Sequence, residues 1–123
     1  MPVPVHPLIT VVDDDESVRV SLEGLIRSMG YEVRSFNCAQ AFLDSTARAE
    51  TACVISDVQM PGMSGIELKL ALVAAGEVTP VILMTAFADD GARDRAEQAG
   101  AVGFLRKPFS GDSMISCLER ALA

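Results

Sequence analysis

Four short runs of almost wholly apolar residues recur along the chain: Leu8–Val12, Ala52–Ile55, Val81–Met84 and Ala101–Leu105. Runs this short and this continuous are typical of strands buried on both faces, as in a parallel sheet. A fifth segment, Tyr31–Phe36, alternates apolar and polar residues instead. Such alternation predicts a strand with one wetter face, which suits the edge of a sheet. The pattern therefore predicts five strands, with the second in chain order at an edge.

Between these runs, apolar residues recur at three- and four-residue spacing, which predicts amphipathic helices. Ser64 and Glu67 form a capping box, in which each side chain can bond the backbone amide of the other residue. Gly30, Gly76 and Gly100 follow three of the helical patterns as stop signals. The apolar positions of the expected helices are Val18, Leu22, Leu25, Ile26 and Met29; Ala41 and Phe42; Ile66, Leu70 and Val73; Ala92, Ala96 and Ala99; and Met114, Ile115, Leu118 and Leu122.

Strands and helices alternate along the whole chain, which implies a parallel sheet with helices on both faces. Right-handed crossovers restrict the possible strand orders. We therefore predict an α/β fold, a doubly wound five-stranded parallel sheet of order 2-1-3-4-5 with the flavodoxin-like (βα)5 architecture. No linker or low-complexity tract divides the sequence, so we expect a single domain over residues 1–123, of which residues 1–6 are an N-terminal tail.

The net charge of −7 argues against direct binding to nucleic acid, which requires a basic surface. The sequence contains no apolar run of about 20 residues that could span a bilayer, and its first residues lack the features of a signal peptide. We therefore expect a cytoplasmic protein with no membrane association. The three cysteines lack metal-binding spacing and are expected to be reduced and mostly buried.

Polar residues follow the predicted strands where each strand ends. Asp13 and Asp14 follow the first strand, Asp57 the third, Thr85 the fourth and Lys107 the fifth. In an open α/β sheet, ligands bind beyond the carboxyl ends of the strands, at the point where the strand order reverses. We expect the three carboxylates to converge there, with the hydroxyl and the ammonium group at their margin.

The chemistry of such a cluster follows from its charges. Two carboxylates about 4 Å apart repel each other by roughly 4 kcal/mol at an effective dielectric constant of 20, so three of them would protonate, splay apart or hold a cation. Hard oxygen ligands suit Mg²⁺. A metal ion, an ammonium group and a hydroxyl donor together match three phosphoryl oxygens, and one carboxylate can act as the nucleophile that forms an aspartyl phosphate. Asp15 and Glu16 have a simpler explanation as acidic residues at a helix N-terminus.

These residues give the chain a resemblance to the receiver domains of bacterial two-component response regulators, over essentially its full length. The pattern is most similar to receivers of helix-turn-helix transcriptional regulators. The resemblance implies that residues 1–123 are a single receiver domain and that this chain contains no output domain. The matching segments are Val11–Asp15, Ser56–Gly65, Leu83–Ala86 and Gly103–Phe109.

The resemblance implies a phosphoacceptor and a metal site. Asp57 would accept the phosphoryl group from a histidine kinase or a histidine phosphotransfer protein. Asp14, Asp57 and the backbone carbonyl of Gln59 would bind Mg²⁺ directly, with Mn²⁺ as a possible substitute, and Asp13 would act on the metal mainly through water. Such a domain is not an enzyme in the usual sense, because it catalyses only its own phosphorylation and dephosphorylation.

The resemblance also implies roles in switching. Thr85 would bond the phosphoryl group and Lys107 would pair with its oxygens. Phe104 stands at the position of the family's aromatic switch residue, although an ordinary core phenylalanine is the simpler alternative. Gln59 and Phe87 lie where relatives tune the lifetime of the aspartyl phosphate, and a bulky apolar Phe87 predicts slow hydrolysis.

The predicted helix over Asp90–Ala99 departs from the family pattern. Its inward stripe can consist only of alanines, which bury far less area than leucine or methionine, and Gly91 weakens its first turn. We predict that this helix is loosely held and mobile, with an ordinary solvated helix as the alternative. Many relatives form homodimers through this helix, the fifth strand and the last helix, and here charged contacts would replace the apolar ones.

Other interpretations require residues that this chain lacks. Aspartate-based phosphatases and phosphotransferases usually have a second Asp two residues after the nucleophile, where this chain has Gln59. A flavodoxin-type FMN-binding protein needs a hydroxyl- and glycine-rich loop after the first strand, where this chain has three aspartates. A receiver relative that is not phosphorylated would be expected to lack Asp57, Thr85 or Lys107, and all three are present.

Overall fold

A computed structural model describes residues 6–86 and 90–123 of the chain. Within these residues, five parallel strands form one sheet in the order β2-β1-β3-β4-β5, as the alternation of strands and helices predicts. The half-polar second strand lies at one edge, and β3 lies beside β1 at the reversal of strand order. The strands are β1 (Leu8–Val12), β2 (Glu32–Phe36), β3 (Thr51–Asp57), β4 (Val81–Thr85) and β5 (Gly103–Arg106).

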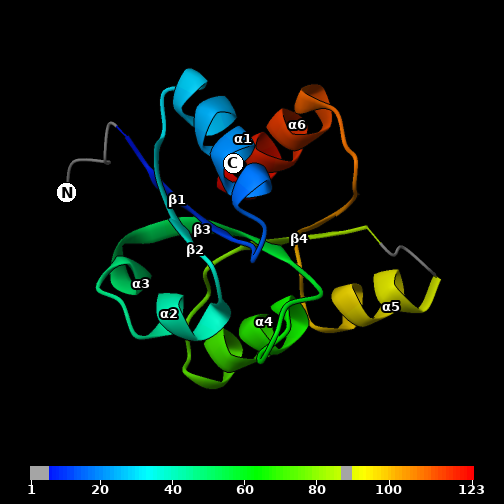
Figure 1. Cartoon of the computed structure of the whole chain (residues 1–123). Coiled ribbons are helices and arrows are strands. Elements are labelled where there is room, and N and C mark those ends of the chain that lie inside the picture. The colour runs from blue at the N-terminus through cyan, green and yellow to red at the C-terminus, as the bar shows by residue number, and fades with distance from the viewer. Residues whose placement is uncertain (1–5, 87–89) are drawn as a thin grey trace.

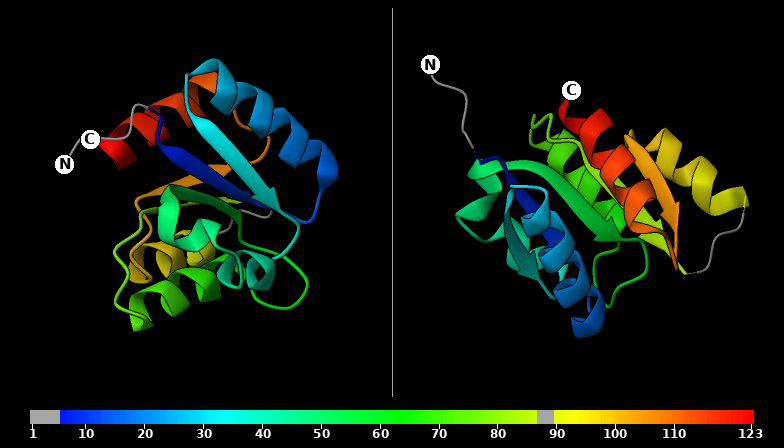
Figure 2. Two further views of the ribbon diagram at one scale, coloured as in Figure 1. Left: turned by 90° about the vertical axis from the view of Figure 1, so that its left-hand side faces the viewer. Right: turned by 90° about the horizontal axis from the view of Figure 1, so that it is seen from above.

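Helices cover both faces of the sheet (Figure 1). On one face α1 and α6 lie side by side, and on the other face lie α2, α4 and α5, as the turned views in Figure 2 also show. No helix among the described residues is long and apolar enough to cross a membrane. The helices are α1 (Glu16–Ser28), α2 (Ala39–Leu43), α3 (Ala47–Glu50), α4 (Gly65–Ala74), α5 (Asp90–Gln98) and α6 (Gly111–Leu122).

Each face of the sheet has its own hydrophobic core, because successive strand residues point to opposite sides. Ile9 and Val11 of β1 belong to the cluster under α1 and α6, whereas Val12 belongs to the cluster under α2, α4 and α5. The first cluster is built from large side chains such as Ile26 of α1 and Met114 of α6. The sheet is thus held from both sides, and its carboxyl-terminal edge remains open for a site.

The start and the burial expected for the last strand both need correction. The fifth strand begins at Gly103 rather than at Ala101, and it is half-buried rather than fully buried. The amide of Ala101 donates to the carbonyl of Ala96 and so closes the end of α5, which removes Ala101 from the strand. The strand is also an edge strand, paired only with β4, so one side of its backbone is uncovered. The one-turn helix α3 was not expected from the sequence.

Helix α4 begins at the predicted capping box. Ser64 Oγ accepts from the amide of Glu67 at 3.1 Å, and Glu67 Oε1 accepts from the amide of Ser64 at 2.9 Å. Two of the three apolar positions used to predict this helix, Leu70 and Val73, are about half exposed, whereas Ile66 is partly buried against the core. The buried residues of the helix include Leu68 and Leu72 instead. Apolar residues surround this helix on most sides, so their spacing alone could not identify the inward face.

Candidate functional site

Three carboxylates converge at the open edge of the sheet. Asp13 directly follows β1 and is fully buried, Asp14 is exposed, and Asp57 is the last residue of β3. One oxygen from each of the three lies within 4.8 Å of the others. The register explains the convergence, since Val12 of β1 lies opposite Ser56 of β3, so both strands end at the same level. The sequence therefore predicted the meeting of these side chains correctly.

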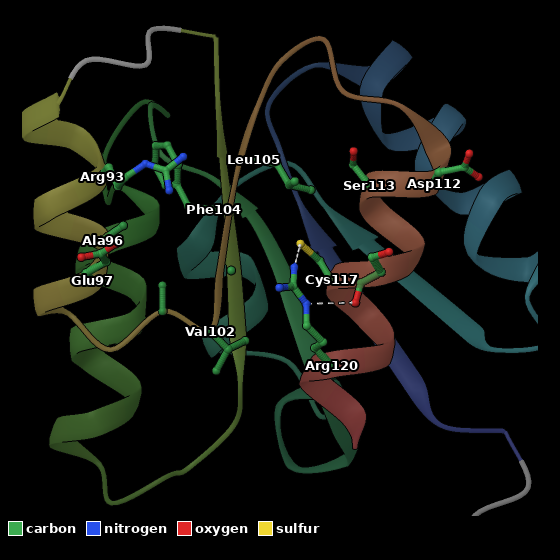
Figure 3. Close-up of a pocket in the computed structure, with 13 residues that line it drawn as sticks. Arg93, Ala96, Glu97, Val102, Phe104, Leu105, Asp112, Ser113, Cys117 and Arg120 are labelled. Carbon is green, nitrogen blue, oxygen red and sulfur yellow. Dashed lines mark hydrogen bonds between the residues drawn. The ribbon is translucent and has the colours of Figure 1, made fainter.

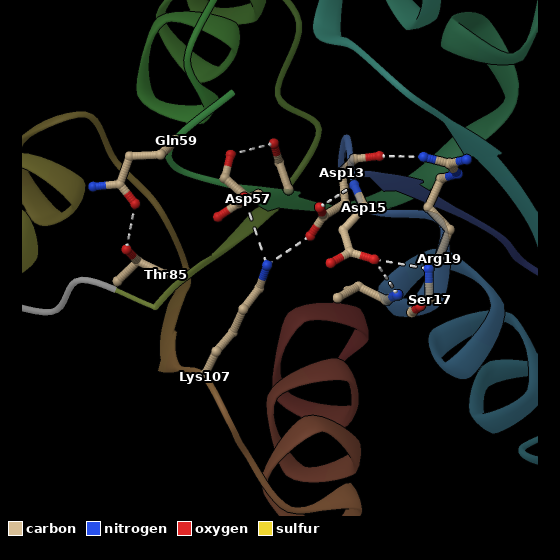
Figure 4. Close-up of polar contacts among 10 residues, drawn as sticks. Asp13, Asp15, Ser17, Arg19, Asp57, Gln59, Thr85 and Lys107 are labelled. Atoms are coloured by element: carbon tan, nitrogen blue, oxygen red, sulfur yellow. Dashed lines mark hydrogen bonds and ion pairs between the residues drawn. The ribbon is translucent and has the colours of Figure 1, made fainter. Parts of the chain in front are cut away.

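Both carboxylate oxygens of Asp13 have partners within the protein (Figure 4). Oδ1 accepts from the amide of Asp15 at 2.9 Å, and Oδ2 accepts from Lys107 Nζ at 2.8 Å. The backbone carbonyl of Asp13 accepts from the Arg19 guanidinium at 2.8 Å. Asp13 is therefore held at three points, whereas the neighbouring Asp14 carboxylate is exposed.

Asp15 connects this turn to helix α1. Its carboxylate accepts from the amides of Ser17 at 2.8 Å and Val18 at 3.4 Å, which makes it the N-cap of the helix. This agrees with the structural explanation of Asp15 given by the sequence. Arg19 was not identified from the sequence, and its only signal there is its position one turn into a helix that follows the acidic residues. Asp15 and Arg19 thus anchor the turn that presents Asp13 and Asp14.

Lys107 lies closer to Asp13 than to Asp57. Its Nζ atom is 2.8 Å from Asp13 Oδ2 and 3.5 Å from Asp57 Oδ2. Burial lowers the pKa of the Lys107 ammonium, but the hydrogen bond and the charge of Asp13, together with Asp57, outweigh burial and leave that pKa raised. Lys107 is therefore a fixed positive charge in the site at neutral pH. The amide of Lys107 also donates to the carbonyl of Thr85 at 2.7 Å, which ties the ends of β4 and β5 together.

The Asp57 carboxyl lies in an unfavourable environment for its charge. Burial raises its pKa, Lys107 opposes that effect, and the charge of Asp13 adds to it, so the pKa is raised overall. One lysine cannot offset three carboxylates, and the cluster retains a negative charge. Hard carboxylate oxygens that carry a net negative charge fit a divalent cation such as Mg²⁺.

Gly65 brings the start of α4 against Asp57. A Cβ atom at position 65 would lie 2.4 Å from the carbonyl oxygen of Asp57 and 2.9 Å from Leu83 Cδ2. The amide of Gly65 donates to the carbonyl of Val58 at 3.0 Å. Only glycine allows this approach, because the nearest atom is rigid backbone. Gly65 lies in the segment Ser56–Gly65 that resembles the receiver pattern, but the sequence alone did not explain why glycine is required at this position.

The Thr85 side chain forms a hydrogen bond with Gln59. Thr85 is fully buried at the end of β4, and its Oγ1 donates to Gln59 Oε1 at 2.7 Å (Figure 4). The sequence predicted that Thr85 would lie at the margin of the carboxylates but did not predict this partner. The sequence resemblance assigned Gln59 a metal-binding backbone carbonyl and a role in the lifetime of the aspartyl phosphate. Phe87, considered with Gln59, lies outside the described residues.

Phe104 lies on β5 beside a groove between α5 and α6 (Figure 3). Its ring is partly buried, and the guanidinium carbon of Arg93 lies 5.4 Å from the ring centroid. This geometry is that of a cation–π contact. The groove has a volume of about 540 Å³, and charged residues of both signs line it, including Glu97, Asp112 and Arg120.

Comparison with known proteins gives a consistent result. The family model of the response regulator receiver domain matches residues 9–119. The transcriptional regulatory protein FixJ of Bradyrhizobium diazoefficiens is 42% identical over 114 residues, which cover 93% of this chain and 56% of that protein. This chain spans about half the length of the curated relatives it matches.

Solved structures have the same fold. The response regulator StyR superposes with a TM-score of 0.87 at 43% identity, covering 95% of this chain and 59% of that one. The chemotaxis protein CheY4 of Vibrio cholerae also superposes with a TM-score of 0.87, at 28% identity, and the match covers 95% of this chain and 99% of that one. The structural likeness therefore extends over nearly all of this chain.

Proposed function

This chain belongs to the family of response regulator receiver domains, and from that premise we propose that Asp57 accepts a phosphoryl group from a histidine kinase or a histidine phosphotransfer protein. One observation carries the proposal: the oxygens of Asp13, Asp14 and Asp57 lie within 4.8 Å of one another, and Lys107 Nζ lies within 3.5 Å of Asp57. A carboxylate oxygen of Asp57 attacks phosphorus, the P–N bond of the phosphohistidine breaks, and its electron pair leaves with the imidazole nitrogen.

The metal-binding residues are Asp14, Asp57 and the backbone carbonyl of Gln59, which together would hold Mg²⁺ or, in its place, Mn²⁺. When bound, the metal supplies positive charge that offsets the carboxylates and the phosphoryl oxygens. Asp13, whose two oxygens accept from Asp15 and Lys107, would act on the metal mainly through water. Burial raises the pKa of Asp57, and a cation bound nearby would favour the charged, nucleophilic form of that carboxyl.

Lys107 and Thr85 bind the transferred group. Lys107 is within reach of Asp57, and a modest rotation of its flexible side chain exchanges Asp13 for a phosphoryl oxygen. Thr85 donates its hydroxyl hydrogen to a second oxygen. Gln59 and Phe87, the latter outside the described residues, set the lifetime of the aspartyl phosphate. The domain catalyses its own phosphorylation and dephosphorylation only.

Phosphorylation acts on the face formed by α5, β5 and α6. Phe104 of β5 turns inward when Thr85 moves, which changes the surface beside the groove. That face binds a downstream partner or a second copy of this chain, with charged residues such as Glu97 and Arg120 in place of apolar contacts. The output is control of transcription, because the relatives include proteins named as transcriptional regulators. We place this single receiver domain, residues 1–123, in the cytoplasm, without direct contact to nucleic acid.

The test is phosphorylation by a small phosphodonor. The protein is incubated with acetyl phosphate and Mg²⁺, and its intact mass is measured. We expect a gain of one phosphoryl group, which chelation of the metal or the substitution Asp57→Asn abolishes. Asp112→Asn is the matched control, because Asp112 is exposed on α6 and should leave the adduct unchanged. The absence of an adduct, or an adduct that persists in Asp57→Asn, would show that the proposed function is wrong.

A further inference from the structure

The hydroxyl group of Thr85 donates a hydrogen bond to the side chain of Gln59. Thr85 Oγ1 donates to Gln59 Oε1 at 2.7 Å, and the two residues are 26 positions apart in the chain. A threonine hydroxyl has a single hydrogen to donate. The same hydrogen cannot serve Gln59 and a phosphoryl oxygen at once. Any phosphoryl group that binds Thr85 must therefore displace Gln59 from it.

We propose that Gln59 is a positioning residue: its side chain holds the Thr85 hydroxyl in the unphosphorylated orientation and thereby weakens binding of a phosphoryl group at Asp57. The inference rests on the proposed function of Asp57. It differs from the role of Gln59 in phosphate lifetime, because it concerns the equilibrium between two partners of Thr85 and not the attack of water.

The backbone on both sides of this contact is fixed. The carbonyl of Thr85 accepts from the amide of Lys107 at 2.7 Å, and the amide of Val58, next to Gln59, donates to the carbonyl of Met84 at 2.8 Å. Gly65 also bonds the carbonyl of Val58. Because these bonds hold the two main-chain segments, the partner of Thr85 can change by rotation of the Thr85 and Gln59 side chains.

The exchange of partners has a defined cost. A phosphoryl oxygen carries negative charge and is a stronger acceptor than a carboxamide, so it can displace Gln59. Gln59 is exposed, so its carboxamide returns to water and leaves no unsatisfied group in the interior. The cost is therefore one ordinary hydrogen bond, which corresponds to roughly a three- to tenfold effect on the affinity for the phosphoryl group.

The experiment measures the affinity of the protein for beryllium fluoride, a stable phosphoryl mimic, in the presence of saturating Mg²⁺. The variant Gln59→Met keeps the length of the side chain and removes the acceptor. We expect it to bind the mimic roughly three- to tenfold more tightly than the wild type. Gln98→Met, an exposed substitution on α5, is the matched control and should bind like the wild type.

Thr85→Val completes a double-mutant cycle. In that background no hydroxyl remains to be held, so Gln59→Met should not tighten binding further. An equal tightening with and without Thr85 would show that Gln59 acts directly on the bound group, and unchanged or weaker binding in Gln59→Met alone would also overturn the proposal. Affinity for Mg²⁺ alone, measured in parallel, detects any effect on the metal site.

A second measurement does not require the mimic. Three-bond couplings in the free protein report the side-chain rotamer of Thr85. We expect one rotamer in the wild type and averaging in Gln59→Met, while identical couplings in the two proteins would refute the positioning role. If the wild type binds no beryllium fluoride, the proposed function of Asp57 fails, and these couplings still decide whether Gln59 holds Thr85.

Discussion

Helices α1 and α5 both pack against the sheet, but they are attached to it very differently. Helix α1 buries Leu22 and Ile26, which are 3% and 0% exposed. Helix α5 buries Ala92 and Ala96, each 1% exposed, so its inward stripe consists of small residues, as the sequence predicted. Because burial stabilises by about 25 cal/mol per Å² of apolar surface, we expect α1 to be held more strongly than α5.

The two helices also adjoin different parts of the site. Helix α1 begins at Asp15, directly after the carboxylates Asp13 and Asp14, whereas α5 packs beside β5 and contacts Phe104 through Arg93. Large buried side chains thus lie next to the carboxylates, and small ones lie next to the face where we propose a change of shape. We expect this difference in side-chain size to separate binding from movement.

The largest expected effect on stability comes from truncating a large buried side chain of α1. Ile26→Ala should lower the free energy of unfolding by about 2–5 kcal/mol, because it leaves a cavity in the core under α1. Ala96→Gly should cost only about 1 kcal/mol, which is close to the difference in helix propensity. Urea denaturation measures both. Val20→Ala, at an exposed position of α1, is the control, and equal losses for Ile26→Ala and Ala96→Gly would contradict the comparison.

Hydrogen exchange should show the same contrast without a mutation. We expect amides of α5 to exchange at least about tenfold faster than amides in the middle of α1, because fewer buried contacts oppose local opening. Exchange is followed by mass spectrometry or NMR in the unphosphorylated protein. Equal protection of the two helices would mean that α5 is an ordinary solvated helix, which is the alternative left open by its sequence.

The smallest expected effect concerns the contact between α5 and Phe104. Arg93→Gln removes the cation over the ring, and the lost interaction is worth about 0.5–1 kcal/mol at such an exposed site. We expect the chemical shifts of the Phe104 ring to change as the ring populates a second orientation, with little change in the free energy of unfolding. Arg95→Gln, also exposed on α5, should leave the ring signals in place, and a similar shift there would rule out a specific contact.

The sequence predicted those features that depend on strand order and on chain polarity. Asp13, Asp57 and Lys107 meet because each follows a strand of one parallel sheet, and the carboxyl ends of such strands lie at a common edge. The amphipathic pattern likewise identified the buried alanines of α5. The roles of these residues in phosphoryl transfer stay predictions.

Features that depend on side-chain conformation could not be predicted. The hydrogen bond between Gln59 and Thr85 depends on the conformations of both side chains. Lys107 Nζ lies 0.7 Å closer to Asp13 Oδ2 than to Asp57 Oδ2. The spacing of residues along the sequence does not encode either contact. The late start of β5 has a similar cause, since α5 uses the amide of Ala101 to close its last turn. In each case one hydrogen bond selects among arrangements that the hydrophobic pattern does not distinguish.

The missing side chain at Gly65 has a mechanical consequence. The backbone of α4 at Gly65 lies so close to the Asp57 carbonyl that a Cβ atom would not fit between them. No deformable side chain therefore separates the end of β3 from the first turn of α4. A displacement of the Asp57 backbone should therefore be transmitted directly to α4, because no side chain lies between them to absorb it. Gly65 thus gives Asp57 a short, stiff mechanical coupling to α4.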